Sequence, residues 1–422
     1  MNIKYNHYFT FTFLVYCLGA ASLYYDNSIR YNYGIIFIFW FFYIFRENPI
    51  KKVNGQDLIF LIYKVILLFI PSLAIYYYHQ HDLTPTLFLI LLCFDFLEKI
   101  FDKPINESSI ATNMSLNKKD LIIYFILSSY TIIGPYFFGQ GNHLLGMSSF
   151  MFPFSISLIY LEKIMKTLKH PVYGGLFLIY HFCFTAVYLS FHWVGMGRVF
   201  LAFFLLSPIL IYFHYCRIFI YQIFFYFLCP IALMILQSSR YKNFSFEEYL
   251  IGSAGYHLQL TELTRTTQYY IESKWNTFFN EYMLLFFINM PRSIWTSKPL
   301  PIGFWGVDVM FEDNIRTSPT IGVDKEFSIS LGFVGEQFLM LGKDFYIGLI
   351  FVLLSIFVIR KITYYLSFKS IVPLLIFDLN FVSYIWGGMA IFASRLWVLL
   401  IPSLIFLLAQ YIYNTYIKKD LI

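Results

Sequence analysis

Three arginines stand where a permanent positive charge is unusual for so apolar a chain. Arg198 follows a Gly-Met-Gly stretch, and Arg395 lies in a long apolar segment. Arg292 is the second residue of a Pro-Arg-Ser-Ile-Trp-Thr-Ser-Lys-Pro sequence that also contains Lys298. A charge at membrane depth costs about 2.5–3.5 kcal/mol on insertion scales, so such residues are functional candidates. Guanidinium groups are planar, always charged and bidentate, which suits a pyrophosphate. The arginines therefore predict an anion site, to which Lys298 would add a fourth cation.

Each arginine also has an ordinary structural interpretation. Arg198 would serve as an anchor at the membrane interface, with its charged head in water. Arg395 would be an ion-pair partner between helices, and Arg292 a solvated loop residue. At the level of sequence these alternatives stay open.

Candidates for a general base lie in the same polar part of the chain. Glu326 and Glu336 are ten residues apart, and His257 is the only histidine between residues 238 and 343. A carboxylate or imidazole there would accept the proton of an attacking hydroxyl, although each residue is individually more typical of a solvated or ion-paired role. Tight metal-ligand spacing, a P-loop and a Gly-x-Ser-x-Gly motif are all missing. Neither a metal nor a cofactor is expected.

Composition indicates which elements hold these residues. Hydrophobic residues make up 59% of the 422 residues, charged residues 13%, and the mean hydropathy is +0.64. A soluble fold cannot hide so much apolar surface, and apolar runs of about 20 residues are typical of helices that cross a bilayer. The predicted fold class is an all-α integral membrane protein of about twelve transmembrane helices. One large extracytoplasmic loop, containing short helices, interrupts them.

The expected spans lie at about 8–25, 32–46, 57–78, 84–101, 120–138, 148–165, 173–193, 198–215, 217–237, 344–362, 369–386 and 389–412.

Lys and Arg are distributed unevenly between the short loops. They concentrate in alternate loops, one of which holds Arg360 and Lys361, whereas the intervening loops hold only Arg30 and the membrane-edge Arg198 and Arg395. The positive-inside rule then places both termini in the cytoplasm and the long loop in the periplasm or cell exterior. The net charge of +6 mostly reflects this bias and does not indicate a nucleic-acid partner.

The chain divides into three regions. Residues 1–237 form a bundle of about nine transmembrane helices, residues 238–343 the large extracytoplasmic loop, and residues 344–422 the C-terminal transmembrane helices with a cytoplasmic tail. Within the loop, segment 276–290 is apolar but only about 15 residues long, so it predicts an interfacial helix. Segment 291–325 is rich in Pro and Gly and lacks periodicity, which predicts loop.

The chain resembles the bacterial O-antigen and capsule repeat-unit polymerases. The resemblance lies in many apolar spans, cytoplasmic termini, one large external loop, the Pro-Arg-x-x-Trp-x-x-Lys-Pro stretch and a Gly-Glu sequence at the return to the membrane. The family has an Arg-x10-Gly pattern, which Arg292 and Gly303 match. Arg198 departs from it, because Ile209 stands eleven positions further on. In topology the resemblance covers the whole chain, but in motif only about residues 291–342.

The resemblance implies a membrane glycosyltransferase of the GT-C-like group in the bacterial inner membrane. Such an enzyme transfers the growing glycan from undecaprenyl pyrophosphate to the non-reducing end of a new carrier-linked repeat unit. The implied roles are pyrophosphate binding for Arg292, Arg198 and Arg395, with support from Lys298, and proton acceptance for Glu336, Glu326 or His257. The expected partners are the lipid-linked oligosaccharide, as donor and acceptor, and membrane lipid. A chain-length regulator protein is a further candidate partner.

Two other functions remain open from the sequence. An O-antigen ligase uses the same donor but transfers to a lipid A core, and the family ligases use a histidine in the large loop; His257 lies earlier than that pattern requires. A lipid-linked oligosaccharide flippase, or another transporter, would carry charges along its central spans and short loops on both sides. In the first half of the chain, Lys64 is the only Lys or Arg deep within an expected span.

Overall fold

The computed structural model describes residues 117–138, 143–168, 170–192, 198–216, 274–303, 331–368 and 370–417. Every regular element within these ranges is a helix. In chain order the elements are α6 (Lys118–Phe138), α7 (His143–Leu168), α8 (Pro171–His192), α9 (Arg198–Cys216), α12 (Lys274–Phe287), α14 (Gly332–Leu341), η3 (Gly342–Asp344), α15 (Phe345–Leu366), α16 (Val372–Gly387), α17 (Met389–Ile412) and η4 (Tyr413–Ile417).

The helices that the sequence predicts in these ranges are present. The expected spans from 120–138 to 198–215 correspond to α6, α7, α8 and α9, and the last three expected spans to α15, α16 and α17. The segment 276–290, for which an interfacial helix is expected, is helical as far as Phe287 in α12. The spans predicted at 8–25, 32–46, 57–78, 84–101 and 217–237 lie outside the described residues.

Two of the described helical stretches are long and apolar enough to cross a membrane. One is Gly332–Leu366, which joins α14, η3 and α15, and the other is Met389–Tyr416; each has a mean hydropathy of 2.2. The first begins inside the range assigned to the extracytoplasmic loop, because α14 is apolar and buried along its whole length. The expected boundary at 343 therefore falls within this helical stretch.

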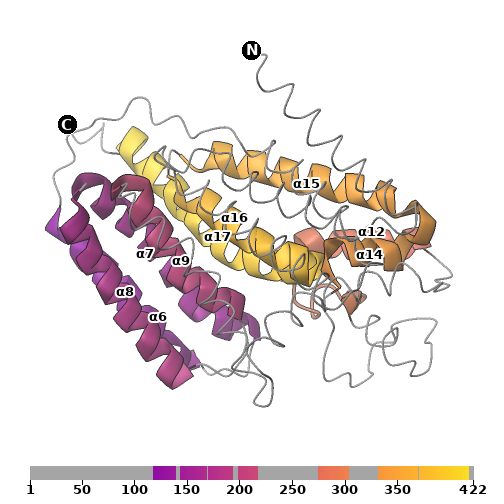
Figure 1. The fold of residues 1–422 in the computed structure, drawn as a ribbon, viewed down its shortest axis with the longest axis horizontal. Helices are drawn as coiled ribbons and strands as arrows, with labels where there is room; N and C mark the ends of the chain where they lie inside the picture. Colours follow the sequence, from indigo (N-terminus) through magenta and orange to yellow (C-terminus); the bar gives the residue numbers. More distant parts are fainter. Residues whose placement is uncertain are drawn as a thin grey trace, which may run out of the picture.

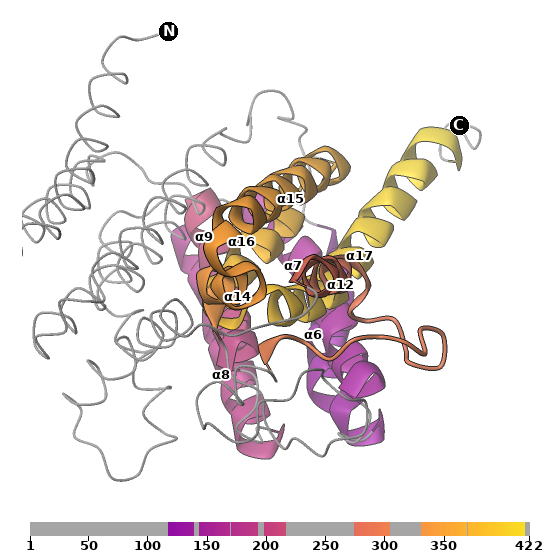
Figure 2. The same cartoon turned by 90° about the vertical axis from the view of Figure 1, so that its right-hand side faces the viewer.

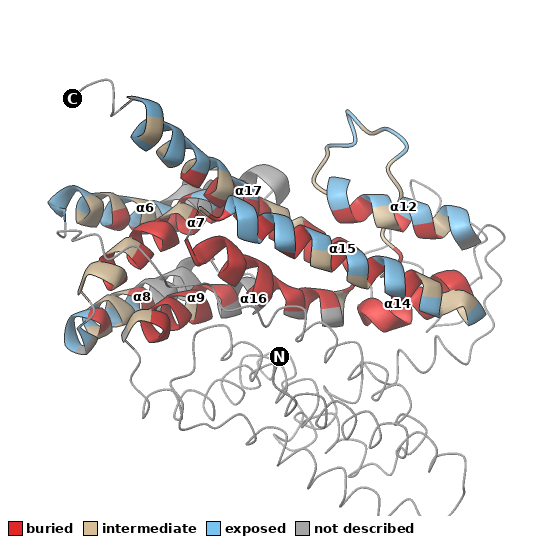
Figure 3. Ribbon diagram, turned by 90° about the horizontal axis from the view of Figure 1, so that it is seen from above, coloured by how far each residue is buried: buried red, intermediate tan, exposed pale blue. Residues whose placement is uncertain are grey.

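The helices form an elongated bundle with α7, α9, α16 and α17 at its centre (Figure 1). Helices α6 and α8 pack on one side of this centre, while α12, α14 and α15 gather towards the opposite end (Figures 1 and 2). Figure 3 shows α16 buried over most of its described residues, whereas α15 and α17 each expose one face. Exposed apolar side chains on α15, such as Ile350, Leu354 and Val358, form the kind of surface that faces lipid.

The chain reverses direction between α16 and α17 at a single glycine. Phe377 and Phe392 are 15 residues apart in sequence, yet their ring centroids lie 5.8 Å apart. In one straight helix they would be about 22 Å apart. Gly388 has φ +81° and ψ −176° at this turn, a conformation that side chains rarely tolerate. The turn brings the first residue of α17 beside α14.

The opposite end of α16 is held by a buried carboxylate. Glu162 on α7 accepts hydrogen bonds from Tyr215 Oη at 2.8 Å, from Ser370 Oγ at 2.5 Å and from the Ile371 backbone N–H at 3.1 Å. The carboxylate therefore lies at the N-terminus of α16, where the helix dipole favours negative charge. It joins α7, α9 and α16 at one point.

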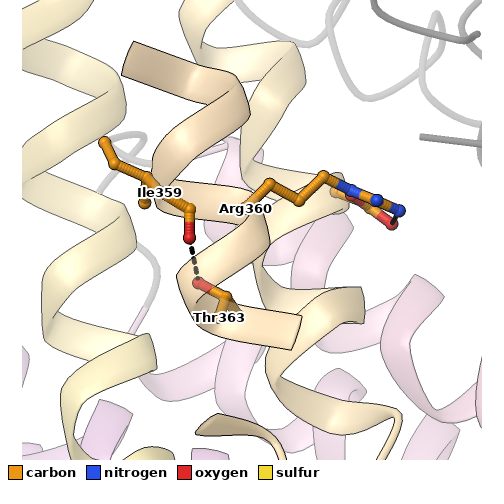
Figure 4. A network of polar contacts seen from close by, with 4 residues as sticks. Ile359, Arg360 and Thr363 are labelled. Atoms are coloured by element: carbon orange, nitrogen blue, oxygen red, sulfur yellow. Dashed lines mark hydrogen bonds and ion pairs between the residues drawn. The ribbon is translucent and has the colours of Figure 1, made fainter. Parts of the chain in front are cut away.

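Arg360 has a different environment from the one that the sequence suggests. Its guanidinium extends from α15 to Asp378 on α16 and makes two hydrogen bonds, at 2.9 and 3.3 Å (Figure 4). Both residues are buried. The interpretation of Arg360 as a loop residue is therefore wrong, because it lies within α15, where a bidentate partner on the neighbouring helix compensates its burial. Thr363, one turn further on, bonds to the Ile359 carbonyl.

Candidate functional site

Helix α12 has one buried face and one exposed face, and most of the exposed side chains are apolar. Phe278, Leu284 and Leu285 are fully buried. The exposed residues are Trp275, Phe279, Met283, Phe286 and Phe287, which are apolar, and Asn276 and Asn280, which are polar. A water-facing helix would be polar there, so this face is suited to lipid at the membrane boundary.

A compact cationic turn follows α12. The Lys298 ammonium donates hydrogen bonds to the carbonyls of Ile288 and, at 3.1 Å, Met290, directly after α12. The Arg292 guanidinium donates to the Lys298 carbonyl at 2.7 Å and is otherwise exposed. Burial lowers the pKa of the Lys298 ammonium, and the neighbouring Arg292 charge lowers it further. Lys298 therefore shapes the turn, while Arg292 offers its charge to the surface.

Two contacts attach α12 and this turn to α17. The Trp397 indole N–H donates to the Leu285 carbonyl at 2.8 Å, and the Asn289 side-chain amide donates to the Ser394 carbonyl at 3.4 Å. Asn289 precedes Arg292 by three residues, and Ser394 precedes Arg395 by one. Two of the three predicted arginines therefore lie on neighbouring segments, although more than a hundred residues separate them in sequence.

Arg395 lies inside the bundle on α17. Its guanidinium donates to Ser383 Oγ on α16 at 3.2 Å. The bond joins the two helices just beyond the Gly388 turn, with a neutral hydroxyl as the acceptor. This bond gives the Arg395 side chain a defined orientation towards α16.

Glu336 is buried at the corner formed by α14, α16 and α17. Its Oε2 accepts the Met389 backbone N–H at 2.9 Å, at the first residue of α17. Its other oxygen lies so close to Gly388 that a Cβ at that position would overlap it. Carboxylates are favoured at helix N-termini, so the turn, the glycine and the carboxylate form one structural unit.

A second carboxyl group lies beside this unit, and sequence reasoning did not select it. Glu281 on α12 is 2% exposed, and its Oε2 accepts the Ile302 backbone N–H at 3.1 Å. Burial raises the pKa of Glu281, and the hydrogen bond from Ile302 offsets part of that rise. An acidic residue within the apolar stretch 276–290 was the available signal, because an isolated charge in such a segment is a functional candidate.

The remaining predicted site residues are not all placed. Arg198 is the first residue of α9, and its side chain lies outside the described part of the structure. His257 and Glu326 also lie outside the described residues. Among the residues that are described, no group of three or more His, Cys, Asp or Glu side chains is arranged to hold a metal ion.

The site thus combines an exposed guanidinium, a second arginine on an adjacent segment, two buried carboxyl groups and an apolar helix face. Comparison with protein-family models, curated proteins and solved structures finds no match to this chain.

Proposed function

We propose that the chain is an inner-membrane polymerase of undecaprenyl-pyrophosphate-linked oligosaccharide repeat units. It would transfer the growing glycan of an O-antigen or capsular polysaccharide to the non-reducing end of a new lipid-linked repeat. The observation that carries the proposal is the contact between the Arg292 turn and the Arg395 segment through Asn289 and Ser394. Two guanidinium groups on adjacent segments, near a lipid-facing helix, suit a lipid-linked pyrophosphate.

The apolar face of α12 suits the lipid part of such a substrate. A polyprenyl chain needs a continuous apolar path beside the charged site. The side chains of Phe279, Met283 and Phe286 are exposed along one face of α12 and lead to the Arg292 turn. In this arrangement the polyprenyl tail lies along α12 and the pyrophosphate reaches the cations at its C-terminal end.

The transfer divides the chemistry between cations and a base. The acceptor hydroxyl oxygen forms a bond to the anomeric carbon of the donor, and the bond from that carbon to the phosphate oxygen breaks. The pyrophosphate leaves with the bonding electron pair, and Arg292 and Arg395 stabilise its developing charge. The hydroxyl proton passes to a carboxylate, for which Glu336 is the proposed acceptor. Cleavage of the bond between the sugar and the pyrophosphate drives the step, so the reaction needs no nucleotide sugar.

A glycan gel tests the proposal in cells. Cells that lack this gene, complemented with the wild type, are expected to show a ladder of long glycans. Without the gene, or with Arg292→Ala, the ladder collapses to core plus a single repeat unit. Loss of every glycan-bearing band, with long carrier-linked chains accumulating, would indicate a ligase instead. An unchanged ladder would exclude both transferases and favour a transporter.

A further inference from the structure

Glu281 and Glu336 form a pair of buried carboxyl groups on two helices that pack together. Each residue is 2% exposed, and each accepts one backbone N–H. Helices α12 and α14 are in contact, and the two carboxyl groups are close enough for their charges to interact. Two carboxylates so placed in a low-dielectric interior do not both remain ionised.

The surroundings of the two groups decide which one keeps the proton. Glu336 is bonded to the first residue of the 24-residue helix α17, whose dipole and N–H groups favour an anion. Among the described residues, the donor to Glu281 is the Ile302 N–H. Within the described residues its Oε1 is fully buried and has no hydrogen-bond partner. An ionised oxygen left in that position would carry a large desolvation cost, which a protonated carboxyl avoids.

We propose that Glu281 is a positioning residue of the transfer site, protonated at neutral pH, so that Glu336 is the single buried anion of the pair. Through its bond to Ile302, the neutral carboxyl also holds the far end of the Arg292 turn against α12. This role in transfer rests on the function proposed above, whereas the protonation of the pair does not.

The cations on elements around α12 are already engaged or exposed. Arg395 on α17 donates to Ser383, and Arg360 on α15 is paired with Asp378. Lys361 on α15 is exposed. In the turn after α12, Lys298 donates to backbone carbonyls and Arg292 is exposed. Glu336 is therefore the charged group whose electrostatic interaction with Glu281 matters most.

Infrared spectroscopy of the purified, full-length protein tests the pair directly, because a protonated carboxyl absorbs apart from a carboxylate. At neutral pH the wild type is expected to show a protonated-carboxyl band that Glu281→Gln removes and Glu336→Gln retains. Glu336→Gln should also lower the pH at which that band disappears by about one unit or more, since it removes the neighbouring negative charge. Glu162→Gln is the matched control and should leave both the band and its titration unchanged.

Any of three results would contradict the proposed protonation of Glu281. The band could be absent from the wild type at neutral pH, it could persist in Glu281→Gln, or its titration could be unchanged in Glu336→Gln. Glutamine keeps an oxygen for the Ile302 N–H, so Glu281→Gln should retain the fold, which thermal unfolding checks. If the wild type shows the band but no glycan transfer, the protonation stands and the proposed function fails.

The role in transfer has its own measurement. Glu281→Gln preserves a neutral acceptor for Ile302 and should keep transfer within about threefold of the wild type, whereas Glu281→Ala releases the turn and should lower it about tenfold or more. Equal losses in both variants, with the protein folded, would contradict a positioning role for a neutral carboxyl.

Discussion

A buried carboxyl group from another helix lies beside each end of α16, and the two groups have contrasting environments. They are Glu162 of α7 and Glu336 of α14. At the first end, Glu162 accepts hydrogen bonds from two hydroxyl groups and one backbone N–H. At the other end, the bond that Glu336 accepts within the described part of the chain is from the Met389 backbone N–H, and a second carboxyl group, Glu281, lies close by. Both groups lie at a helix N-terminus, so the helix dipole favours each anion. The two carboxyl groups differ in how many hydrogen-bond donors surround them: Glu162 has two hydroxyl donors in addition to its backbone N–H.

A fully satisfied carboxylate is suited to holding helices together, because proton uptake would cost it several hydrogen bonds. A carboxylate with fewer donors and a second carboxyl group beside it holds helices less well, but it exchanges a proton more easily. The comparison therefore assigns structure to the Glu162 end and chemistry to the Glu336 end. The arginines follow the same division: Asp378 pairs with Arg360, while Arg292 is exposed.

Exchanging each carboxylate for its amide separates the two ends most strongly. Glu336→Gln should lower glycan transfer by about 10²–10⁴-fold, the usual contribution of a general base, with little change in thermal stability. Glu162→Gln should lower stability by about 1–3 kcal/mol because it disrupts a buried hydrogen-bonded group. Its transfer rate per folded molecule should stay within about threefold of the wild type. Thermal unfolding and carrier-linked glycan transfer, measured on both variants, check this; the reverse pattern would contradict the division.

Breaking the buried ion pair should have the next largest effect. Arg360→Ala removes the guanidinium that pairs with the buried Asp378 carboxylate and should destabilise the protein by about 3–5 kcal/mol. The double variant Arg360→Met, Asp378→Leu removes both charges and should recover most of that loss. Chemical unfolding in detergent measures both. If the single variant were as stable as the wild type, the pair would have no structural role.

The Gly388 turn can be tested with a single methyl group. Gly388→Ala would place a Cβ against the Glu336 carboxyl, at a residue with φ +81°. It should cost about 1–3 kcal/mol and reduce transfer, because the turn and the carboxylate move together. Gly175→Ala is the matched control: its Cβ would meet nothing within 4 Å, and alanine favours the helix by about 0.5–1 kcal/mol. Equal effects on thermal unfolding would show that the Gly388 geometry has no special importance.

The attachment of α12 to α17 should give the smallest effect. Trp397→Phe removes the indole N–H that bonds to the Leu285 carbonyl but keeps an aromatic ring. The expected loss is about 1 kcal/mol of stability, with a transfer rate lowered less than in Glu336→Gln. Thermal unfolding and transfer assays measure it. A loss of transfer as large as that of Glu336→Gln would mean that α12 takes a more direct part in the chemistry.

The sequence predicted the helices better than the partners of their charges. Apolar length alone is enough to locate α15, α16 and α17, since each apolar run forms a helix regardless of its neighbours. Partners such as Asp378 for Arg360, or Asn289 for Ser394, depend on packing between segments far apart in the chain. The acidic residues in apolar stretches, Glu281 among them, were visible as anomalies, but only packing reveals what each one contacts.

The central claim is that the Arg292 end of the molecule carries out transfer from a pyrophosphate carrier. The most direct measurement incubates the purified protein with an undecaprenyl-pyrophosphate-linked repeat unit and follows glycan length. The wild type should form chains of two or more repeats, and Arg292→Ala should lower the rate about 10²–10³-fold while it unfolds at the wild-type temperature. Lys361→Ala, which removes an exposed cation on α15, should behave like the wild type. Chain extension by Arg292→Ala at the wild-type rate would contradict the account.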